Sequence, residues 1–451
     1  MKVALLGAGH IGQTIARLLA ASGDYQVTVM DQNAAALARI AGHPGHHADP
    51  AITSVVVDTE DAPALLAALR AGGGHDTVVN ALPYHLAVAT ATLAREAGCH
   101  YFDLTEDVAA TRAIKQLAQG ARTAFMPQCG LAPGFIGIVA HHLTKGFESL
   151  HDVKMRVGAL PAFPTNALKY NLTWSVDGLI NEYCHPCEAI RDGQLIDMLP
   201  LEGLEHFSLD GTEYEAFNTS GGLGTLCETL AGRVRTLDYK SVRYPGHQAL
   251  MKMLLEDLRL KDDPATLKSI LRKSVPGTMQ DVVLVFVTVS GMRNGALVQE
   301  VFARKIFADR GRVAAGPPQG DSALSGGGSG AARPWGQPAA GPSQGDSAPS
   351  GGGLGTAQPW GQPAAGPPQG DSAPSGGGSG AARPWGQLND APLSAIQITT
   401  AAGLCAAVDL FREGRLPQQG FIRQEQLELP AFLANRFGNA YQQSRQVESI
   451  G

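Results

Sequence analysis

The chain has 451 residues with a formal net charge of −6, and 44% of its residues are hydrophobic. This length is enough for two or three domains and a large core. The acidic balance, with no basic face readable in the sequence, argues against nucleic acid as a partner. No run of about 18 apolar residues is present to span a membrane, and the first residues do not resemble a signal peptide. We therefore expect a cytoplasmic protein without a membrane partner.

The motif with the clearest chemistry opens the chain. Val3–Leu6 is an apolar run with strand character, and the GAGHIG that follows it fits the pattern G-x-G-x-x-G. Gln13–Ala21 then shows helical spacing. A glycine turn between a strand and a helix is typical of dinucleotide binding, because the helix N-terminus offers free N–H groups to phosphates. The residues expected to bind the cofactor here are Gly7, Ala8, Gly9, His10, Ile11 and Gly12.

The second predicted strand, Gln26–Met30, ends beside an acidic residue. Asp31 lies nineteen residues after Gly12, where a dinucleotide fold places the acid that binds the ribose. A carboxylate there accepts hydrogen bonds from both ribose hydroxyls and repels a 2′-phosphate. This favours NAD over NADP, although NADP is possible and Asp31 could also be an ordinary turn residue.

The same alternation of strand and helix continues to about residue 130. The further predicted strands are Ile52–Val57, Thr77–Leu82, Tyr101–Leu104 and Ala124–Met126, with helices at Ala62–Arg70 and Ala87–Ala97. Six short strands separated by helices predict an α/β fold with a doubly wound parallel sheet.

The loops after these strands hold further candidate ligands of the cofactor. In an open parallel sheet the end of the fourth strand lies beside the first strand, at the switch point where ligands bind. Asn80 and Ala81 close the fourth strand, and Thr105 follows the fifth. Asp58, after the third strand, is placed to approach the adenine. We expect all four to contact the dinucleotide.

After Gly134 the pattern changes to a second domain. A predicted helix, Ile136–Leu143, precedes the alternating strand Val153–Leu160. Two long predicted strands, Val282–Ser290 and Leu297–Phe307, flank an Arg-Asn-Gly sequence that is a strong hairpin turn signal. This region predicts an α+β domain built on a mixed, largely antiparallel sheet.

A compositionally distinct segment interrupts the chain at residues 316–387. Three copies of a 25-residue unit, marked by Trp335, Trp360 and Trp385, are rich in Gly, Pro, Ser, Ala and Gln. Such a segment buries too little apolar surface to offset its chain entropy, so we expect it to be disordered. Two interpretations of the segment remain. We favour a repeat expansion that a surface loop tolerates, and the other interpretation is a Pro-Trp ligand for a binding partner.

The chain then resumes at 394–400 and continues as a predicted helix, Ala401–Arg412, which is apolar enough to pack on the first sheet. The resulting division assigns residues 1–130 and 400–451 to the dinucleotide-binding domain. Residues 131–315 and 388–399 form the substrate domain.

Six cysteines are scattered along the chain, and only Cys184 and Cys187 have a metal-like or redox-like spacing. Without a second pair, this spacing more often belongs to two ordinary thiols, so we expect no metal site.

Several stretches resemble a known family. They are GAGHIG, GLAPG at 130–134, KYNLTWSVDGLINEY at 169–183, EAFNTSGG at 215–222 and YKSVRYPGH at 239–247. Together they resemble the saccharopine dehydrogenase-like oxidoreductases, which include glutamate-forming saccharopine dehydrogenase and lysine 6-dehydrogenase. The resemblance implies a Rossmann domain, a second domain with a mixed sheet, NAD(P), and oxidation of an amine at the lysine ε-nitrogen. We also expect a homodimer.

The resemblance also implies residues that bind an amino-acid substrate. Arg243 matches the Arg that binds an amino-acid carboxylate, and a guanidinium suits a carboxylate because it binds in bidentate fashion. Tyr84 and His85 resemble residues that touch the substrate, and Asn171 and Tyr244 complete the expected pocket. Ala132 stands where saccharopine reductases carry an acidic residue, which puts saccharopine itself in doubt.

Oxidation of a C–N bond needs a group that takes the amine proton, because only the neutral amine can expel hydride. The candidate bases are Glu106, His85 and His247, and each could instead be structural. Trp174 is predicted to belong to the core rather than to the substrate wall. Saccharopine dehydrogenase and lysine 6-dehydrogenase remain near-equal readings. A dinucleotide-binding sensor without catalytic activity is the alternative from another class.

Overall fold

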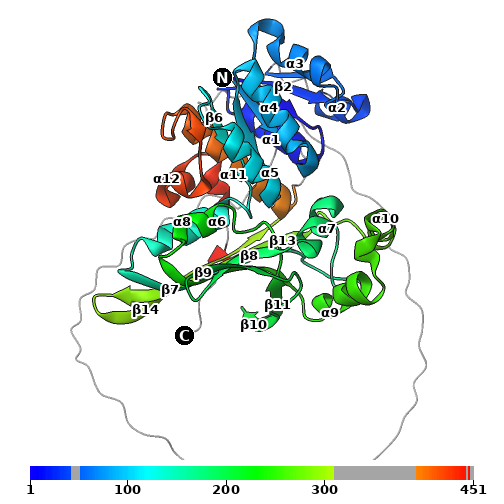
Figure 1. Cartoon of the computed structure of the whole chain (residues 1–451). Coiled ribbons are helices and arrows are strands. Elements are labelled where there is room, and N and C mark those ends of the chain that lie inside the picture. The colour runs from blue at the N-terminus through cyan, green and yellow to red at the C-terminus, as the bar shows by residue number, and fades with distance from the viewer. Residues whose placement is uncertain (42–50, 309–392, 443–444, 447–451) are drawn as a thin grey trace, which may run out of the picture. The chain divides into compact units, whose positions relative to one another are not determined.

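The computed structural model describes residues 1–41, 51–308, 393–442 and 445–446. All of them belong to one compact unit formed by Met1–Arg312 and Pro384–Gly451. The predicted insertion at 316–387 lies outside the described residues. Two sheets organise this unit, one drawn in blue to cyan and the other in green (Figure 1).

The first sheet confirms the predicted doubly wound parallel fold. Its order is β15-β6-β5-β4-β1-β2-β3, and all neighbouring pairs are parallel. The strands are β1 (Lys2–Leu6), β2 (Gln26–Asp31), β3 (Ile52–Val56), β4 (Thr77–Asn80), β5 (His100–Asp103), β6 (Ala124–Met126) and β15 (Gly420–Phe421). Residues 3 to 6 of β1 are fully buried, because helices cover both faces of a parallel sheet. β15, supplied by the C-terminal region, was not expected from the sequence.

The helices of this half are α1 (His10–Ala21), α2 (Ala34–Ala41), α3 (Ala62–Arg70), α4 (Ala87–Ala97) and α5 (Val108–Leu117). α1 begins three residues earlier than predicted, inside the GAGHIG motif, with Gly9 as its N-cap. β4 ends two residues earlier than predicted, because the Asn80 side chain accepts a hydrogen bond from the Leu82 N–H and turns the chain out of the sheet.

The second sheet is mixed and largely antiparallel, as predicted. Its order is β10-β11-β12-β7-β13-β14-β16, with β8 paired to β12 and β9 to β8, and β7 and β12 are its parallel pair. The strands are β7 (Ser149–Pro161), β8 (Cys187–Arg191), β9 (Gln194–Met198), β10 (Glu205–Leu209), β11 (Thr212–Asn218), β12 (Val234–Arg243), β13 (Asp281–Arg293), β14 (Ala296–Phe307) and β16 (Arg445–Gln446). The β13–β14 turn has positive φ at Asn294 and Gly295, as the sequence signal predicted.

Helices lie between the two sheets and at one end of the second sheet. They are α6 (Phe135–Thr144), α7 (Val176–Cys184), α8 (Leu226–Leu230), α9 (His247–Lys252) and α10 (Pro264–Ser274). α12 (Leu429–Ala434) contacts α6 and α11. Figure 1 shows α6 and α8 between the two sheets, and α7, α9 and α10 at the far end of the second sheet. One hydrophobic cluster runs from the first sheet through α6 to the second sheet.

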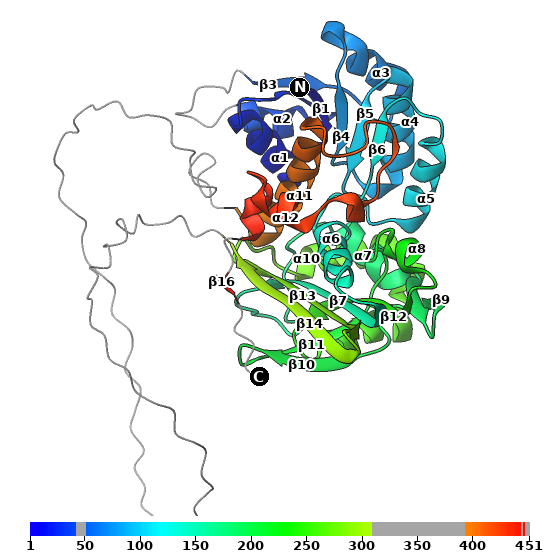
Figure 2. The ribbon, with the colours of Figure 1, turned by 90° about the vertical axis from the view of Figure 1, so that its left-hand side faces the viewer.

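α11 (Ala395–Arg412) connects the two sheets. It begins six residues earlier than predicted, because Ser394 and Gln397 form a capping box and Asp281 on β13 accepts hydrogen bonds from the N–H groups of Ala395 and Ile396. Its body lies alongside α1 (Figure 2). The predicted domain boundary at 399/400 therefore falls inside one continuous helix. Among the described helices, α11 is long and apolar enough to cross a membrane, but 83% of it is buried inside the structure, as in a core helix.

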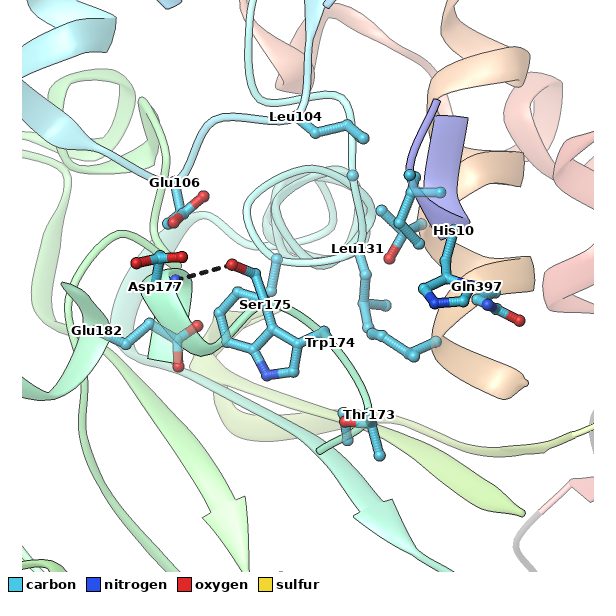
Figure 3. Close-up of a pocket in the computed structure, with 18 of the residues that line it drawn as sticks. His10, Leu104, Glu106, Leu131, Thr173, Trp174, Ser175, Asp177, Glu182 and Gln397 are labelled. Carbon is cyan, nitrogen blue, oxygen red and sulfur yellow. Dashed lines mark hydrogen bonds between the residues drawn. The ribbon is translucent and has the colours of Figure 1, made fainter. Parts of the chain in front are cut away.

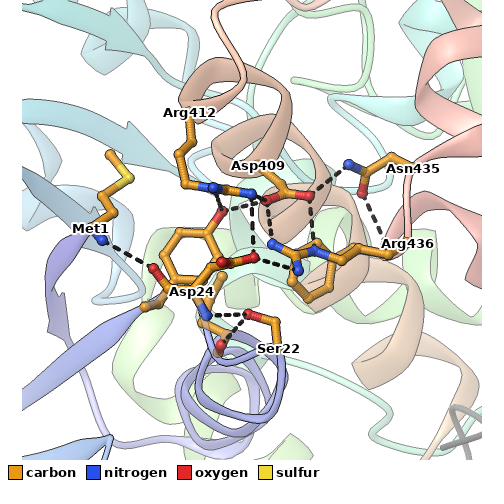
Figure 4. A network of polar contacts seen from close by, with 10 residues as sticks. Met1, Ser22, Asp24, Asp409, Arg412, Asn435 and Arg436 are labelled. Carbon is orange, nitrogen blue, oxygen red and sulfur yellow. Dashed lines mark hydrogen bonds and ion pairs between the residues drawn. The ribbon is translucent and has the colours of Figure 1, made fainter. Parts of the chain in front are cut away.

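A polar network fixes the C-terminal end of α11 to the start of β2 (Figure 4). The buried carboxylate of Asp409 accepts hydrogen bonds from the Tyr25 hydroxyl at 2.6 Å and from Arg436 at 2.7 Å. Burial alone would raise the pKa of Asp409, but the hydrogen bonds from Arg436, Tyr25 and Asn435 hold that pKa below its usual value. The segment around Arg436 is thus tied to the first sheet, whereas β16, further along the chain, pairs with β14 of the second sheet.

Candidate functional site

A cavity of about 790 Å³ lies where the glycine turn, the loops after β4, β5 and β6, and one face of the second sheet meet. This volume is in the range of small-molecule and cofactor sites. Three carboxyl side chains, those of Glu106, Asp177 and Glu182, gather on one side of it, and His10 and Gln397 lie on the other (Figure 3). The residues that line it come from both sheets.

The glycine turn leaves room for a dinucleotide. A side chain at Gly12 would clash with the carbonyl of Gly7, and one at Gly7 would meet the carbonyl of Ala81, so these two glycines allow close packing. Gly9 differs, because a Cβ there would meet nothing within 4 Å, and Gly9 lines the cavity. Gly9 is also the N-cap of α1 and provides no side-chain cap, so the helix N-terminus keeps free N–H groups for a phosphate. These features fit the predicted cofactor.

Of the other residues of this turn, His10 and Ile11 line the cavity, whereas Ala8 is buried. The Ala8 N–H donates a hydrogen bond of 2.7 Å to one carboxylate oxygen of Asp31, and the other oxygen accepts one from the Asn33 N–H. Asp31 therefore holds the glycine turn in addition to its predicted ribose contact. Each carboxylate oxygen has a second lone pair for a ribose hydroxyl.

The loop after β4 brings two predicted residues to the cavity and leaves two away from it. Ala81 and Tyr84 line the cavity, whereas the His85 side chain is exposed and is not among the lining residues. Asn80 is buried and positions the loop, since it binds the Tyr101 hydroxyl and the Leu82 N–H. The structure thus removes His85 from the candidate bases, because it points to solvent from the short helix Tyr84–Leu86.

The loop after β5 is held by Asp103. Its buried carboxylate accepts hydrogen bonds from the N–H groups of Thr105 and Gln128. Thr105 and Glu106 consequently line the cavity, as predicted. Burial raises the pKa of Glu106 to about 7, and the negative charges of Asp107 and Asp103 add to this. Glu106 can therefore exchange a proton near neutral pH.

Asp58 lies apart from the cavity. Its side chain is exposed and accepts a hydrogen bond from the Glu60 N–H. The predicted contact with the adenine stays a prediction.

Arg243 reaches the cavity from the end of β12. The same face of the sheet presents Tyr239, Ser241, Val157 and Ala159, which also line the cavity. The Arg243 guanidinium is buried, and its Nε donates a hydrogen bond of 2.9 Å to the Tyr183 hydroxyl. These bonds fix its position at the cavity, and its predicted role as a carboxylate clamp stays a prediction.

His247 supports this clamp from behind and does not line the cavity. Its Nδ1 lies 2.8 Å from the Leu168 carbonyl, which can only accept, so Nδ1 carries the proton. Nε2 then accepts a hydrogen bond from the Tyr183 hydroxyl, which itself accepts one from Arg243. Burial, together with the charge of Arg243, lowers the pKa of His247 to about 3. His247 is a positioning residue, which corrects its assignment as a candidate base.

Two predicted substrate residues are also turned away. The Tyr244 hydroxyl bonds to the Pro161 carbonyl, and its ring stacks on Tyr214 on the opposite side of the sheet. The reason is the alternation of side chains along an extended chain, which sends neighbours to opposite faces. Asn171 is buried against Asn166, and its neighbours Leu172 and Thr173 line the cavity instead.

Two features of the cavity were not expected from the sequence. Trp174 forms part of the cavity wall while donating a hydrogen bond to the Tyr170 hydroxyl. Glu182, which was not singled out, also lines the cavity. Ala132, in the loop after β6, lies at the cavity as the resemblance implied. The signal for Glu182 was available, because an acidic residue interrupts the buried face of α7 that carries Val176, Leu179 and Tyr183.

Among the residues that the structure describes, no group of three metal-binding side chains is present, and Cys184 and Cys187 are free thiols.

The fold and this cavity define a class, that of two-domain oxidoreductases that bind NAD(P). Residues 3–126 match the family model of the saccharopine dehydrogenase NADP-binding domain, and residues 130–298 match that of the saccharopine dehydrogenase C-terminal domain. The chain belongs to the saccharopine dehydrogenase family. It is thereby an NAD(P)-dependent oxidoreductase.

One solved structure supports this fold. Saccharopine dehydrogenase (L-Glu forming) from Saccharomyces cerevisiae is similar with a TM-score of 0.64 at 15% identity, over 96% of this chain and 96% of that chain. A myo-inositol dehydrogenase from Corynebacterium glutamicum is more distant, with a TM-score of 0.32 at 15% identity, over 66% of this chain and 74% of that chain.

Proposed function

We propose that the protein oxidises or forms a CH–NH bond of a lysine-derived amino acid with NAD(P). One observation carries this proposal: a buried, rigidly held Arg243 and the carboxyl group of Glu106 line the same cavity as the glycine turn. Arg243 would bind the substrate carboxylate, and Glu106 would face the reacting amine.

The residues suit the chemistry of amine oxidation. NAD(P), when bound, supplies the acceptor for the hydride. Glu106 in its ionised form takes the proton of the amine, so that the neutral nitrogen can expel hydride. Its pKa of about 7 leaves a substantial ionised fraction near neutral pH and a conjugate acid that can return the proton in the reverse direction.

The charges of the cavity favour lysine over saccharopine as the substrate. Arg243 is the only Arg or Lys among the described residues that line it, whereas Glu106, Asp177 and Glu182 are acidic. Saccharopine carries three carboxylates and would place two of them without a cation, while lysine carries one carboxylate and two amines. This supports the lysine 6-dehydrogenase reading, in line with Ala132 in place of an acidic residue.

The deciding experiment follows nicotinamide absorbance with lysine, with saccharopine, and with glutamate plus aminoadipate semialdehyde. We expect turnover with a lysine-derived substrate, and we expect faster turnover of lysine than of saccharopine. Tight binding of the dinucleotide without turnover of any of these compounds would instead support the alternative function, a dinucleotide-binding sensor without catalytic activity.

A further inference from the structure

Glu182 is a buried acid that the reaction described above does not use. It lies on α7, its side chain lines the cavity, and the residue is 7% exposed. Its Oε2 atom is buried and has no hydrogen-bond partner among the described residues. The carboxyl group as a whole has Ser241 as a hydrogen-bond partner, so only Oε2 is left over. A buried polar atom without a partner is costly, so such an atom is commonly paired with a ligand.

Glu182 lines the same cavity as Arg243, the residue proposed to bind the substrate carboxylate. Arg243 uses Nε and Nη1 for the Tyr183 hydroxyl and the Val242 carbonyl, and its Nη2 donates to no described residue. Burial raises the pKa of Glu182 to about 8, while the charge of Arg243 opposes this rise and that of Glu106 adds to it. The two groups therefore interact electrostatically, yet no hydrogen bond joins Oε2 to the guanidinium.

The other acids of the cavity are placed differently. Asp177 pairs with Lys268 at 2.5 Å, so its charge is already compensated. Glu106 comes from the loop after β5 in the first domain, whereas Glu182 and Arg243 both belong to the second domain. The second domain thus contributes a free acceptor atom and a free donor atom to the cavity, and the first domain contributes a separate carboxyl group on the same side as Glu182 (Figure 3).

We propose that Glu182 and Arg243 together recognise the zwitterionic head of an α-amino acid, with Glu182 binding the α-ammonium group and Arg243 the α-carboxylate. The reacting amine at the other end of the substrate is then left to Glu106. This inference deepens the proposed function and rests on it for the identity of the amino acid. It predicts that a simple amine, or an acid without an α-ammonium group, is a poor ligand.

The test compares ligands that differ in one group at a time. With the protein loaded with reduced cofactor, which prevents amine oxidation, calorimetry gives Kd for L-lysine, for ε-aminocaproate, which lacks the α-ammonium group, and for cadaverine, which lacks the carboxylate. L-Norleucine and hexanoate form a second pair without the reacting amine. We expect the wild type to bind each amino acid roughly ten- to a hundredfold more tightly than its analogue without the α-ammonium group.

Glu182→Gln should lose this preference, because its affinity for L-lysine should fall while its affinity for ε-aminocaproate stays unchanged. The matched control is Glu188→Gln, whose carboxylate pairs with Arg112 outside the cavity lining and should leave the preference intact. An equal loss for both ligands would overturn the proposal, since Glu182 would then serve Arg243, proton transfer or the fold. If Glu182→Gln does not fold, a wild type that binds ε-aminocaproate as tightly as L-lysine overturns it as well.

Failure of the proposed function has a separate signature. If the wild type prefers α-amino acids but oxidises no lysine-derived substrate, the zwitterion site is supported and the proposed reaction is wrong. If the wild type binds and oxidises lysine and ε-aminocaproate equally well, the proposed reaction is supported and the zwitterion site is wrong. Binding of neither member of either pair overturns both.

Discussion

Residues a few positions apart in the stretch from Arg243 to His247 have different roles. Arg243 faces the cavity, Tyr244 packs on the other side of the sheet, and His247 holds Tyr183 from behind. The chain of hydrogen bonds from Arg243 through Tyr183 to His247 leaves the guanidinium one orientation. At this scale, function depends on where a side chain points, and residue type alone is a weak guide.

Arg243→Ala should lower kcat/KM roughly ten- to a hundredfold or more, because a charged, partly desolvated hydrogen-bond pair contributes about 1.5–3 kcal/mol. Arg243→Lys should recover only part of the loss, since an ammonium cannot form the two parallel bonds. Kinetics on both variants beside direct titration of NAD(P) provide the check. If Arg243→Ala loses dinucleotide affinity as much as catalysis, Arg243 serves the cofactor or the fold.

Glu106 should govern the acidic limb of the pH profile. Because its pKa is about 7 and the ionised form accepts the proton, kcat/KM for amine oxidation should fall about tenfold per pH unit below that value. Glu106→Gln should lower kcat roughly a hundredfold or more and abolish this limb. If Glu106→Gln keeps the same acidic limb in its pH profile, another group takes the proton.

Asp31 should set the choice between NAD and NADP. Because its carboxylate also binds the Ala8 N–H, Asp31→Asn is the better probe: it keeps an acceptor for the turn and removes the charge that repels a 2′-phosphate. We expect this variant to gain affinity for NADP, while Asp31→Ala weakens both dinucleotides. A wild type that already prefers NADP tenfold or more would contradict the assignment.

At the scale of elements, α11 is the structural link between the two sheets. Its N-terminus is capped by Asp281 of the second sheet, and its C-terminal end is held to β2 through Asp409 and Tyr25. Gln397 and Thr400, on its first turns, line the cavity. A single helix therefore sets the relation of the dinucleotide turn to the substrate wall.

Asp409→Ala should destabilise the protein by about 2–4 kcal/mol, because it leaves Arg436 and the Tyr25 hydroxyl without their buried partner. Chemical unfolding of the variant beside the wild type measures this loss. Asp24→Asn is the control, since the Asp24 side chain is 42% exposed and its pairing with Arg436 should contribute less than about 1 kcal/mol. Equal effects of the two substitutions would contradict the importance of burial.

At the scale of the whole molecule, the described residues on either side of 309–392 meet at one point. The Ala308 N–H bonds to the Asp281 carbonyl, and the Ala395 N–H bonds to the Asp281 carboxylate. The segment between these anchors contains the Trp repeats, and closing such a long loop costs only roughly 2–3 kcal/mol more than a short turn.

Replacing residues 316–387 with a short Gly/Ser turn should leave turnover and Tm nearly unchanged, because both ends of the loop already meet at Asp281. Thermal unfolding and steady-state kinetics of the shortened chain test this. Loss of soluble, folded protein would show that the segment packs against the rest.

The sequence by itself determined the parallel sheet, the glycine turn, the β13–β14 hairpin and the family, because these patterns depend on residues close together in the chain. It also placed Glu106 and Arg243 correctly at the cavity. Only the tertiary structure decided that His85 and Tyr244 point away, that His247 is a positioning residue and that Glu182 lines the cavity. The physical reason is that the cavity is built from segments far apart in sequence, so their packing decides which polar side chains share it.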